Sequence, residues 1–124
     1  MSAPVASEHD EQKAFIRWFR MRFPGVLVHS IPNGAHLAGD AKRRAMQMQR
    51  LKDEGLVVGI PDTFIPKWAT YVEMQPSEGG VVSPEQAAIH ADLRRCGYVV
   101  IVAHGWDEAR EALLAARPNL RAAE

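Results

Sequence analysis

Residues 59–75 read GIPDTFIPKWATYVEMQ and contain two strand-like segments joined by a turn. A Gly/Pro bend leads into the first segment, and residues 66–68 form a hairpin-like link to the second. Glu73 and Gln75 share one face of the second strand, because alternate strand residues point to opposite faces. A hairpin brings Asp62 alongside that strand, so we expect the carboxylates of Asp62 and Glu73 to converge.

Converging carboxylates point to a bound cation. They repel each other, and their removal from water is costly unless a proton or cation lies between them. A hard divalent ion with oxygen ligands relieves both costs, and Mg²⁺ or Mn²⁺ suits such a set. Each residue alone also has a purely structural interpretation, Asp62 as a turn residue and Glu73 as an exposed strand acid. The ordered pair, a Pro-Asp on one strand and a Glu-x-polar on the next, is more specific.

Around this hairpin the chain alternates between helical and strand patterns. We expect helices over residues 8–22, 39–54, 84–95 and 106–116, and strands over 26–29, 56–66, 69–75 and 98–103. The order α-β-α-β-β-α-β-α predicts an α/β fold with a mixed central sheet flanked by helices. The continuous apolar run 98–103 is typical of a central strand that is covered on both faces.

Length and composition indicate one globular domain. The 124 residues predict a single domain over 8–117, a flexible start over 1–7 and a tail over 118–124. A hydrophobic content of 47% and a charged content of 24% exclude a disordered or fibrous chain. No apolar run suits a membrane span, and the first residues lack a signal-peptide pattern. The single cysteine, Cys96, excludes a disulfide framework and favours a reducing cytoplasm, and the five histidines show no zinc-type spacing.

The net charge of zero hides a segregation along the chain. Residues 13–52 contain nine lysines or arginines and one acid, Asp40, so they carry +8 and the remainder carries −8. This separation suits a polyanionic partner on one face. It is equally compatible with two solvated faces of opposite sign.

Short motifs follow one another in a set order over residues 8–108. They are Glu8-x-x-x-Gln12, His29-x-x-Pro32-Asn33-Gly34, Leu51-Lys52-x-x-Gly55, Gly59-x-Pro61-Asp62, Val72-Glu73-Met74-Gln75, Ser83-x-x-Gln86 and Gly97-Tyr98. In this order they resemble the virus-type replication-repair nuclease (VRR-NUC) family, a branch of the PD-(D/E)xK nucleases. The resemblance implies a restriction-endonuclease-like core and metal-dependent hydrolysis of DNA phosphodiester bonds.

The resemblance also implies roles for individual residues. Asp62 and Glu73 become metal-binding carboxylates, with the main-chain carbonyl of Met74 as a further ligand to Mg²⁺ or Mn²⁺. Glu8 becomes the acidic residue of the first helix, reaching the metal directly or through a water molecule, with Glu11 as the alternative.

Gln86 and Gln75 occupy two further catalytic positions of the family. Gln86 corresponds to a glutamine close to the active centre, although it also suits a capping box with Ser83. Gln75 stands where the family has a lysine. An amide donates a hydrogen bond but carries no charge and no acid-base function, and the loss of such a group costs about 10²–10³-fold in rate. The sequence leaves open whether Gln75 is a natural variant or a laboratory substitution.

The expected partner is branched or junction DNA. The residues expected to hold its backbone are Lys42, Arg43, Arg44, Arg50 and Lys52. Asn33 and Gly34 form either a phosphate-binding turn or a plain turn. By analogy with small family members that resemble Holliday-junction resolvases, we expect a homodimer, without a membrane, in the cytoplasm of a bacterial host or phage-infected cell. The alternatives are a non-cleaving junction-binding module of the same fold and an unrelated α/β protein with incidental acids.

Overall fold

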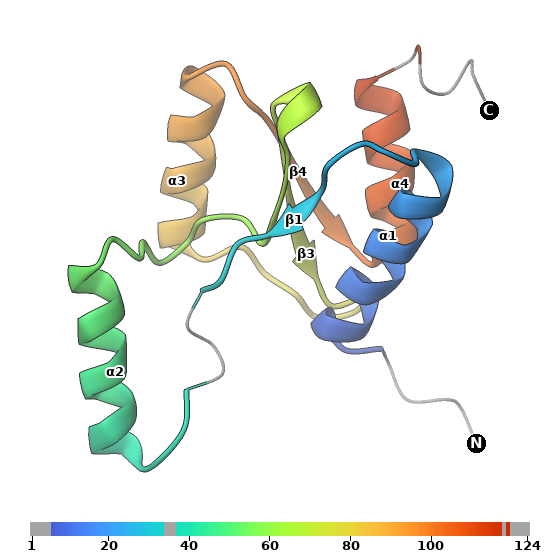
Figure 1. The fold of residues 1–124 in the computed structure, drawn as a ribbon. Coiled ribbons are helices and arrows are strands. Elements are labelled where there is room, and N and C mark those ends of the chain that lie inside the picture. The colour runs from blue at the N-terminus through green and yellow to red at the C-terminus, as the bar shows by residue number, and fades with distance from the viewer. Residues whose placement is uncertain (1–5, 34–36, 118, 120–124) are drawn as a thin grey trace, which may run out of the picture.

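A computed structural model of the chain describes residues 6–33, 37–117 and 119 (Figure 1). Its elements are α1 (Glu8–Arg22), β1 (His29–Ser30), α2 (Ala41–Asp53), β2 (Thr63–Ile65), the 3₁₀ turn η1 (Pro66–Trp68), β3 (Thr70–Gln75), α3 (Pro84–Arg95), β4 (Val99–His104) and α4 (Trp106–Ala116). The predicted order of helices and strands is confirmed, with η1 as the hairpin link.

The strands form one mixed sheet in the order β1-β2-β3-β4. The first two pairings are antiparallel and the pairing of β3 with β4 is parallel, with Thr63 opposite Val72 and Glu73 opposite Val102. The predicted α/β class with a mixed sheet between helices is therefore confirmed.

The prediction that residues 98–103 form a central strand is wrong, because β4 lies at the edge of the described sheet. Helices α3 and α4 nevertheless both pack against this strand. The carbonyl of Val100 accepts a hydrogen bond of 2.9 Å from the guanidinium of Arg94. Helices on both faces explain the apolar run, which does not require a strand on each side.

Two predicted strands are shorter or shifted. β1 begins at His29 rather than at residue 26, and β2 occupies residues 63–65 rather than 56–66. Gly59 adopts a φ of +101°, outside the extended region, and Pro61 has no amide to donate to a neighbouring strand. Regular pairing therefore starts only after this bend.

One face of the sheet carries the hydrophobic core. Helices α1 and α4 pack together there, and Phe15, Phe19, Leu113 and Leu114 are completely buried against Met74 of β3. Because Met74 points into this core, the neighbouring side chains on β3 point to the opposite face, toward α3.

The first helix has the predicted bounds, and its N-cap is the residue just before them. Ser7, which the sequence assigns to a flexible start, is the N-cap of α1, and its hydroxyl accepts a hydrogen bond of 3.1 Å from the amide of Asp10. A reciprocal contact from the Asp10 side chain completes a capping box. The acidic end of α1 is thereby held in place.

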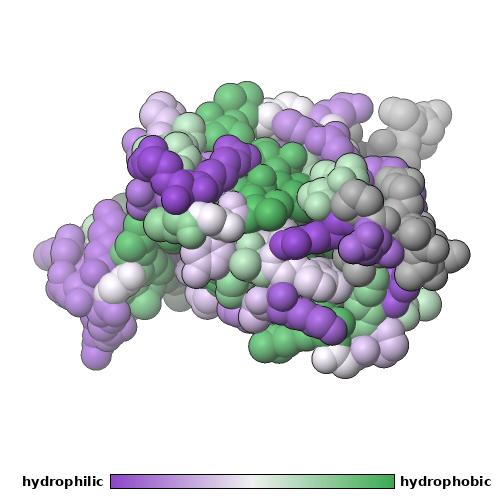
Figure 2. Space-filling view, turned by 90° about the horizontal axis from the view of Figure 1, so that it is seen from above, coloured by the Kyte–Doolittle hydropathy of each residue, from purple (hydrophilic) through white to green (hydrophobic). Residues whose placement is uncertain are grey.

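Helix α2 differs from the other helices because none of its residues is buried. It projects away from the sheet in Figure 1, and Figure 2 shows mainly hydrophilic side chains on that protruding end. Within the described part of the chain, no helix is both long and apolar enough to cross a membrane.

Candidate active site

Asp62 and Glu73 meet where β2 begins and β3 ends. They lie one step beyond the pairing of Thr63 with Val72. An Asp62 Oδ2 atom accepts a hydrogen bond of 3.0 Å from the amide of Met74, which ties the two strands together at this end. Both acids are buried, with Glu73 only 2% exposed. The structure thus brings together the two carboxylates that the hairpin pattern predicts to converge.

This crowding changes the protonation of Glu73. Burial is the largest cause that raises the pKa of Glu73 to about 9, and a hydrogen bond with Asp62 and the charges of Asp62 and Glu8 raise it further. Glu8 also has a raised pKa, first from partial burial and then from the charge of Asp62. Without a cation, the cluster therefore retains a proton at neutral pH.

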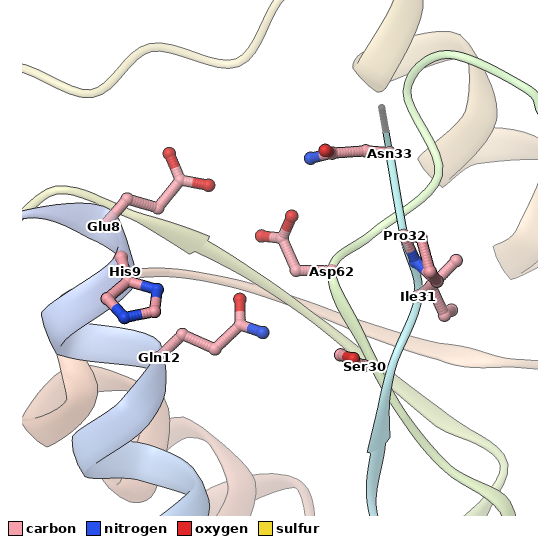
Figure 3. Close-up of a pocket in the computed structure, with 8 residues that line it drawn as sticks. All are labelled: Glu8, His9, Gln12, Ser30, Ile31, Pro32, Asn33 and Asp62. Carbon is pink, nitrogen blue, oxygen red and sulfur yellow. The ribbon is translucent and has the colours of Figure 1, made fainter. Parts of the chain in front are cut away.

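The structure separates the two candidate acids of α1. Glu8 and Asp62 line the same pocket, about 460 Å³ in volume, and both side chains approach it in Figure 3. Glu11 instead accepts a hydrogen bond of 2.7 Å from the amide of Trp106, the first residue of α4. Because the N-cap Gly105 has no side chain, Glu11 provides the acceptor that this helix end requires. Of these two acids of α1, Glu8 is the one that shares the pocket with Asp62.

Gln86 makes both of the contacts that the sequence allows. Its Oε1 accepts a hydrogen bond of 2.9 Å from the amide of Ser83, which forms the expected capping box. Its Nε2 donates to Oε1 of Glu73 at 2.6 Å. A Cβ on Gly59 would lie 3.1 Å from the carbonyl oxygen of Glu85, so the backbone before Asp62 passes directly against the start of α3.

His90 is a neighbour of Glu73 that sequence reasoning missed. It is 2% exposed, and its Nε2 lies 4.0 Å from Oε1 of Glu73. The available signal was the spacing between Gln86 and His90, because residues four apart share one face of a helix.

Gln75 lies on the same strand face as Glu73 and is enclosed by the following loop. Its side chain is buried, and a Cβ placed on Gly80 would approach its Oε1 to 2.8 Å. The carbonyl of Gly80 is in turn within 2.9 Å of Nε2 of His104. The loop at Gly80 therefore packs closely against the Gln75 side chain.

The predicted DNA-binding residues fall in two places. Asn33 lines the pocket with Asp62, whereas Gly34 lies outside the described residues. The five basic residues named for backbone contacts are all exposed on α2: Lys42, Arg43, Arg44, Arg50 and Lys52.

The basic side chains that adjoin the pocket belong to α1. Lys13, Arg17 and Arg20 line a second groove of about 480 Å³, which shares His9 and Gln12 with the carboxylate pocket. Their spacing places these three residues along one side of the helix. A positive surface thus continues directly from the acids.

The residues at the site fit a hard divalent cation held in part by the main chain. In the described residues, no group of three or more His, Cys, Asp or Glu side chains is gathered closely enough to hold a metal ion. Asp62 and Glu73 are joined by the backbone of Met74, whose amide faces Asp62. The carbonyl of a strand residue points to the same side as its amide, so the Met74 carbonyl faces that side too. Such an all-oxygen set suits Mg²⁺ or Mn²⁺, which retain several waters in protein sites.

Comparisons with known proteins identify the fold. Neither a family model nor a curated protein matches the sequence. Among solved structures, a "VRR_NUC domain protein" superposes with a TM-score of 0.71 over 91% of this chain and 89% of that chain, at 20% sequence identity. The chain has a VRR_NUC fold. The superposition covers nearly all of both chains, so the VRR_NUC fold accounts for the whole α/β arrangement from α1 to α4.

Proposed function

We propose that this protein is a VRR-NUC nuclease that hydrolyses DNA phosphodiester bonds with Mg²⁺ or Mn²⁺. The observation that carries the proposal is the convergence of the buried carboxylates of Asp62 and Glu73 at one end of the sheet of a VRR_NUC fold, with Glu8 lining the same pocket as Asp62. Like charges at such a site favour a cation and, through it, an anionic substrate.

The proposed roles follow from position. Asp62, Glu73 and the Met74 carbonyl would hold the cation, and Glu8 would reach it directly or through water. A bound ion would supply Lewis-acid chemistry, since it would polarise a phosphate oxygen and lower the pKa of a water molecule. Gln86 orients Glu73 through its hydrogen bond of 2.6 Å. The amide of Met74 orients Asp62 in the same way.

Gln75 limits the activity of this sequence. A lysine at this position would offset charge that develops on the phosphoryl group, whereas the amide of Gln75 can only donate a hydrogen bond. Cation binding by Asp62 and Glu73 does not depend on residue 75. We therefore expect this protein to bind metal and DNA but to cleave DNA slowly.

The proposed substrate is branched DNA, in particular a four-way junction bound by a homodimer with matching two-fold symmetry. The groove lined by Lys13, Arg17 and Arg20 lies beside the pocket and supports binding of the DNA phosphate backbone. The exposed helix α2 supplies a further positive surface. Light scattering of the purified protein tests the dimer, since a monomer at working concentration contradicts it.

The nuclease proposal is tested with a labelled four-way junction in Mn²⁺. We expect Gln75→Lys to increase the cleavage rate by about 10²–10³-fold over the parent chain. Asp62→Ala in the Gln75→Lys background is the control and should abolish the gain. Equal and negligible cleavage by parent and Gln75→Lys, under conditions where both bind the junction, would count against a nuclease.

The same position favours a second candidate, a junction-binding module that does not cleave. The Gln75 side chain is buried in the fold. Its neutral amide does not supply the positive charge that phosphoryl transfer needs. This candidate predicts tight, salt-sensitive junction binding and no gain of cleavage with Gln75→Lys.

A further inference from the structure

His90 is a buried polar residue, and packing alone does not explain why one of its ring nitrogens has no hydrogen-bond partner. Three buried side-chain nitrogens in the described residues have no hydrogen-bond partner: Nε2 of His90 and the Nε atoms of Arg110 and Arg117. Both arginines donate hydrogen bonds through another nitrogen. The unpartnered His90 atom, in contrast, lies opposite a carboxylate.

The surroundings of that atom are specific. Gln86 and His90 are one turn apart on α3, and both direct a nitrogen toward Oε1 of Glu73, at 2.6 Å and 4.0 Å. An imidazole has at least one N–H donor in either protonation state, and Nε2 can carry it. A shift of about 1 Å converts the longer separation into an ordinary hydrogen bond.

We propose that His90 is a positioning residue, which together with Gln86 clamps Oε1 of Glu73 from α3 and leaves the other oxygen of that carboxylate for the cation. The inference rests on the proposed function, because it assigns Glu73 to the metal. The geometry supports this role. The Glu73 side chain points from β3 toward α3, and without the two contacts from α3 its carboxylate could rotate away from Asp62. Hydrogen bonds at catalytic groups are often long before the substrate complex forms and shorten within it.

The alternative is that His90 only fills space. A leucine of similar size would then fill that space without an unpartnered buried nitrogen, and its introduction would leave the carboxylate unaffected. Partners of metal ligands behave differently, since their removal typically weakens metal binding by about 10–100-fold.

Calorimetry with Mn²⁺ on the full chain, in parallel with thermal unfolding in EDTA, distinguishes the two. We expect His90→Leu to weaken Mn²⁺ binding at least about tenfold without lowering the metal-free unfolding temperature. His90→Gln, whose Nε2 can reach the place of the imidazole Nε2, should retain the parent affinity within about threefold, and the shorter His90→Asn should not.

The outcomes separate this inference from the proposed function. Mn²⁺ binding by the parent with unchanged affinity in His90→Leu overturns the role of His90 and leaves the metal site intact. If His90→Leu does not fold, the Gln and Asn variants decide: equal affinities overturn the inference, and a stronger Gln variant supports it. A parent chain that binds no Mn²⁺ overturns the metal site itself.

Discussion

The carboxylate pocket and helix α2 both collect charge of one sign, but they are built in opposite ways. Asp62 and Glu73 are buried and tied to the backbone and to α3 by hydrogen bonds. Helix α2 has no buried residue, and its Arg50 makes only an exposed contact of 3.9 Å with Glu54. Like charges can be concentrated in a buried pocket only where the fold restrains them, whereas an exposed basic helix acts through its field and needs little support.

The largest effect that would test this contrast is the pH dependence of stability. The pKa of Glu73 is about 9 in the metal-free fold and near its ordinary value of 4.5 when unfolded. The stability from its protonated form is therefore complete below about pH 4.5 and is lost progressively as pH rises toward 9. Urea unfolding in EDTA should show this decline in the parent chain and a flatter profile in Glu73→Gln.

Two controls accompany the pH series. Glu85→Gln, at an exposed position on α3, should keep the slope of the parent. Excess Mn²⁺ should reduce the decline, because a cation between the carboxylates replaces the shared proton. Identical slopes for the parent and Glu73→Gln would show that the pocket does not strain Glu73.

The next largest effect is the difference in free energy of unfolding between truncating a buried side chain of α1 and an exposed side chain of α2. Phe19 of α1 is completely buried, whereas Met46 of α2 is 63% exposed. We expect Phe19→Ala to lower the free energy of unfolding by about 3–5 kcal/mol and Met46→Ala to change it by less than about 0.5 kcal/mol. Urea titrations followed by circular dichroism measure both. A large decrease for Met46→Ala would mean that α2 packs on a surface in solution.

A smaller effect concerns the acid of α1 that does not face the pocket. Glu11→Ala removes the acceptor from the amide of Trp106 and should cost about 1.5–3 kcal/mol in the free energy of unfolding. Glu11→Gln keeps an oxygen acceptor and should recover most of this stability. If Glu11→Ala weakened Mn²⁺ binding and left stability unchanged, Glu11 rather than Glu8 would be the acid at the metal.

The smallest effect on stability is expected on α2. Arg43→Gln with Lys52→Gln should leave the free energy of unfolding within about 0.5 kcal/mol of the parent. It should reduce the slope of log affinity against log salt for junction DNA by about one for each phosphate that the variant no longer neutralises. Lys67→Gln is the control. Lys67 lies in η1, next to the start of β3, whereas the carboxylates lie near the other end of that strand. An unchanged slope would mean that these α2 residues do not contact DNA phosphates, and that the α1 groove is the DNA-binding surface.

Much of the fold was predictable because its signals are local. Helical spacing, the Ser83 cap with Gln86 and the alternation around Val72 and Met74 depend on neighbouring residues, and the structure confirms each of them. The strand limits around Gly59 and the place of β4 were predicted wrongly. Strand limits depend on distant partners, and an apolar run has the same pattern at an edge covered by helices as at the centre.

The site divides in the same way. The approach of Asp62 to Glu73 follows from alternation and a hairpin, both of which can be recognised in the sequence. The separation of Glu8 from Glu11 required the packing of α1 against α4, since both acids lie in the first turn of one helix. His90 became visible only when α3 was placed on the sheet.

By itself, the sequence determined which residues form helices, which face of β3 is polar, and that one acid precedes a strand while another lies near the end of the next strand. Only the tertiary structure decided which acid of α1 joins them, how deeply Glu73 is buried and which α3 side chains surround it. The physical reason is range. Backbone preference and side-chain alternation act between neighbours in the chain, whereas desolvation and charge interactions depend on distances that exist only after folding.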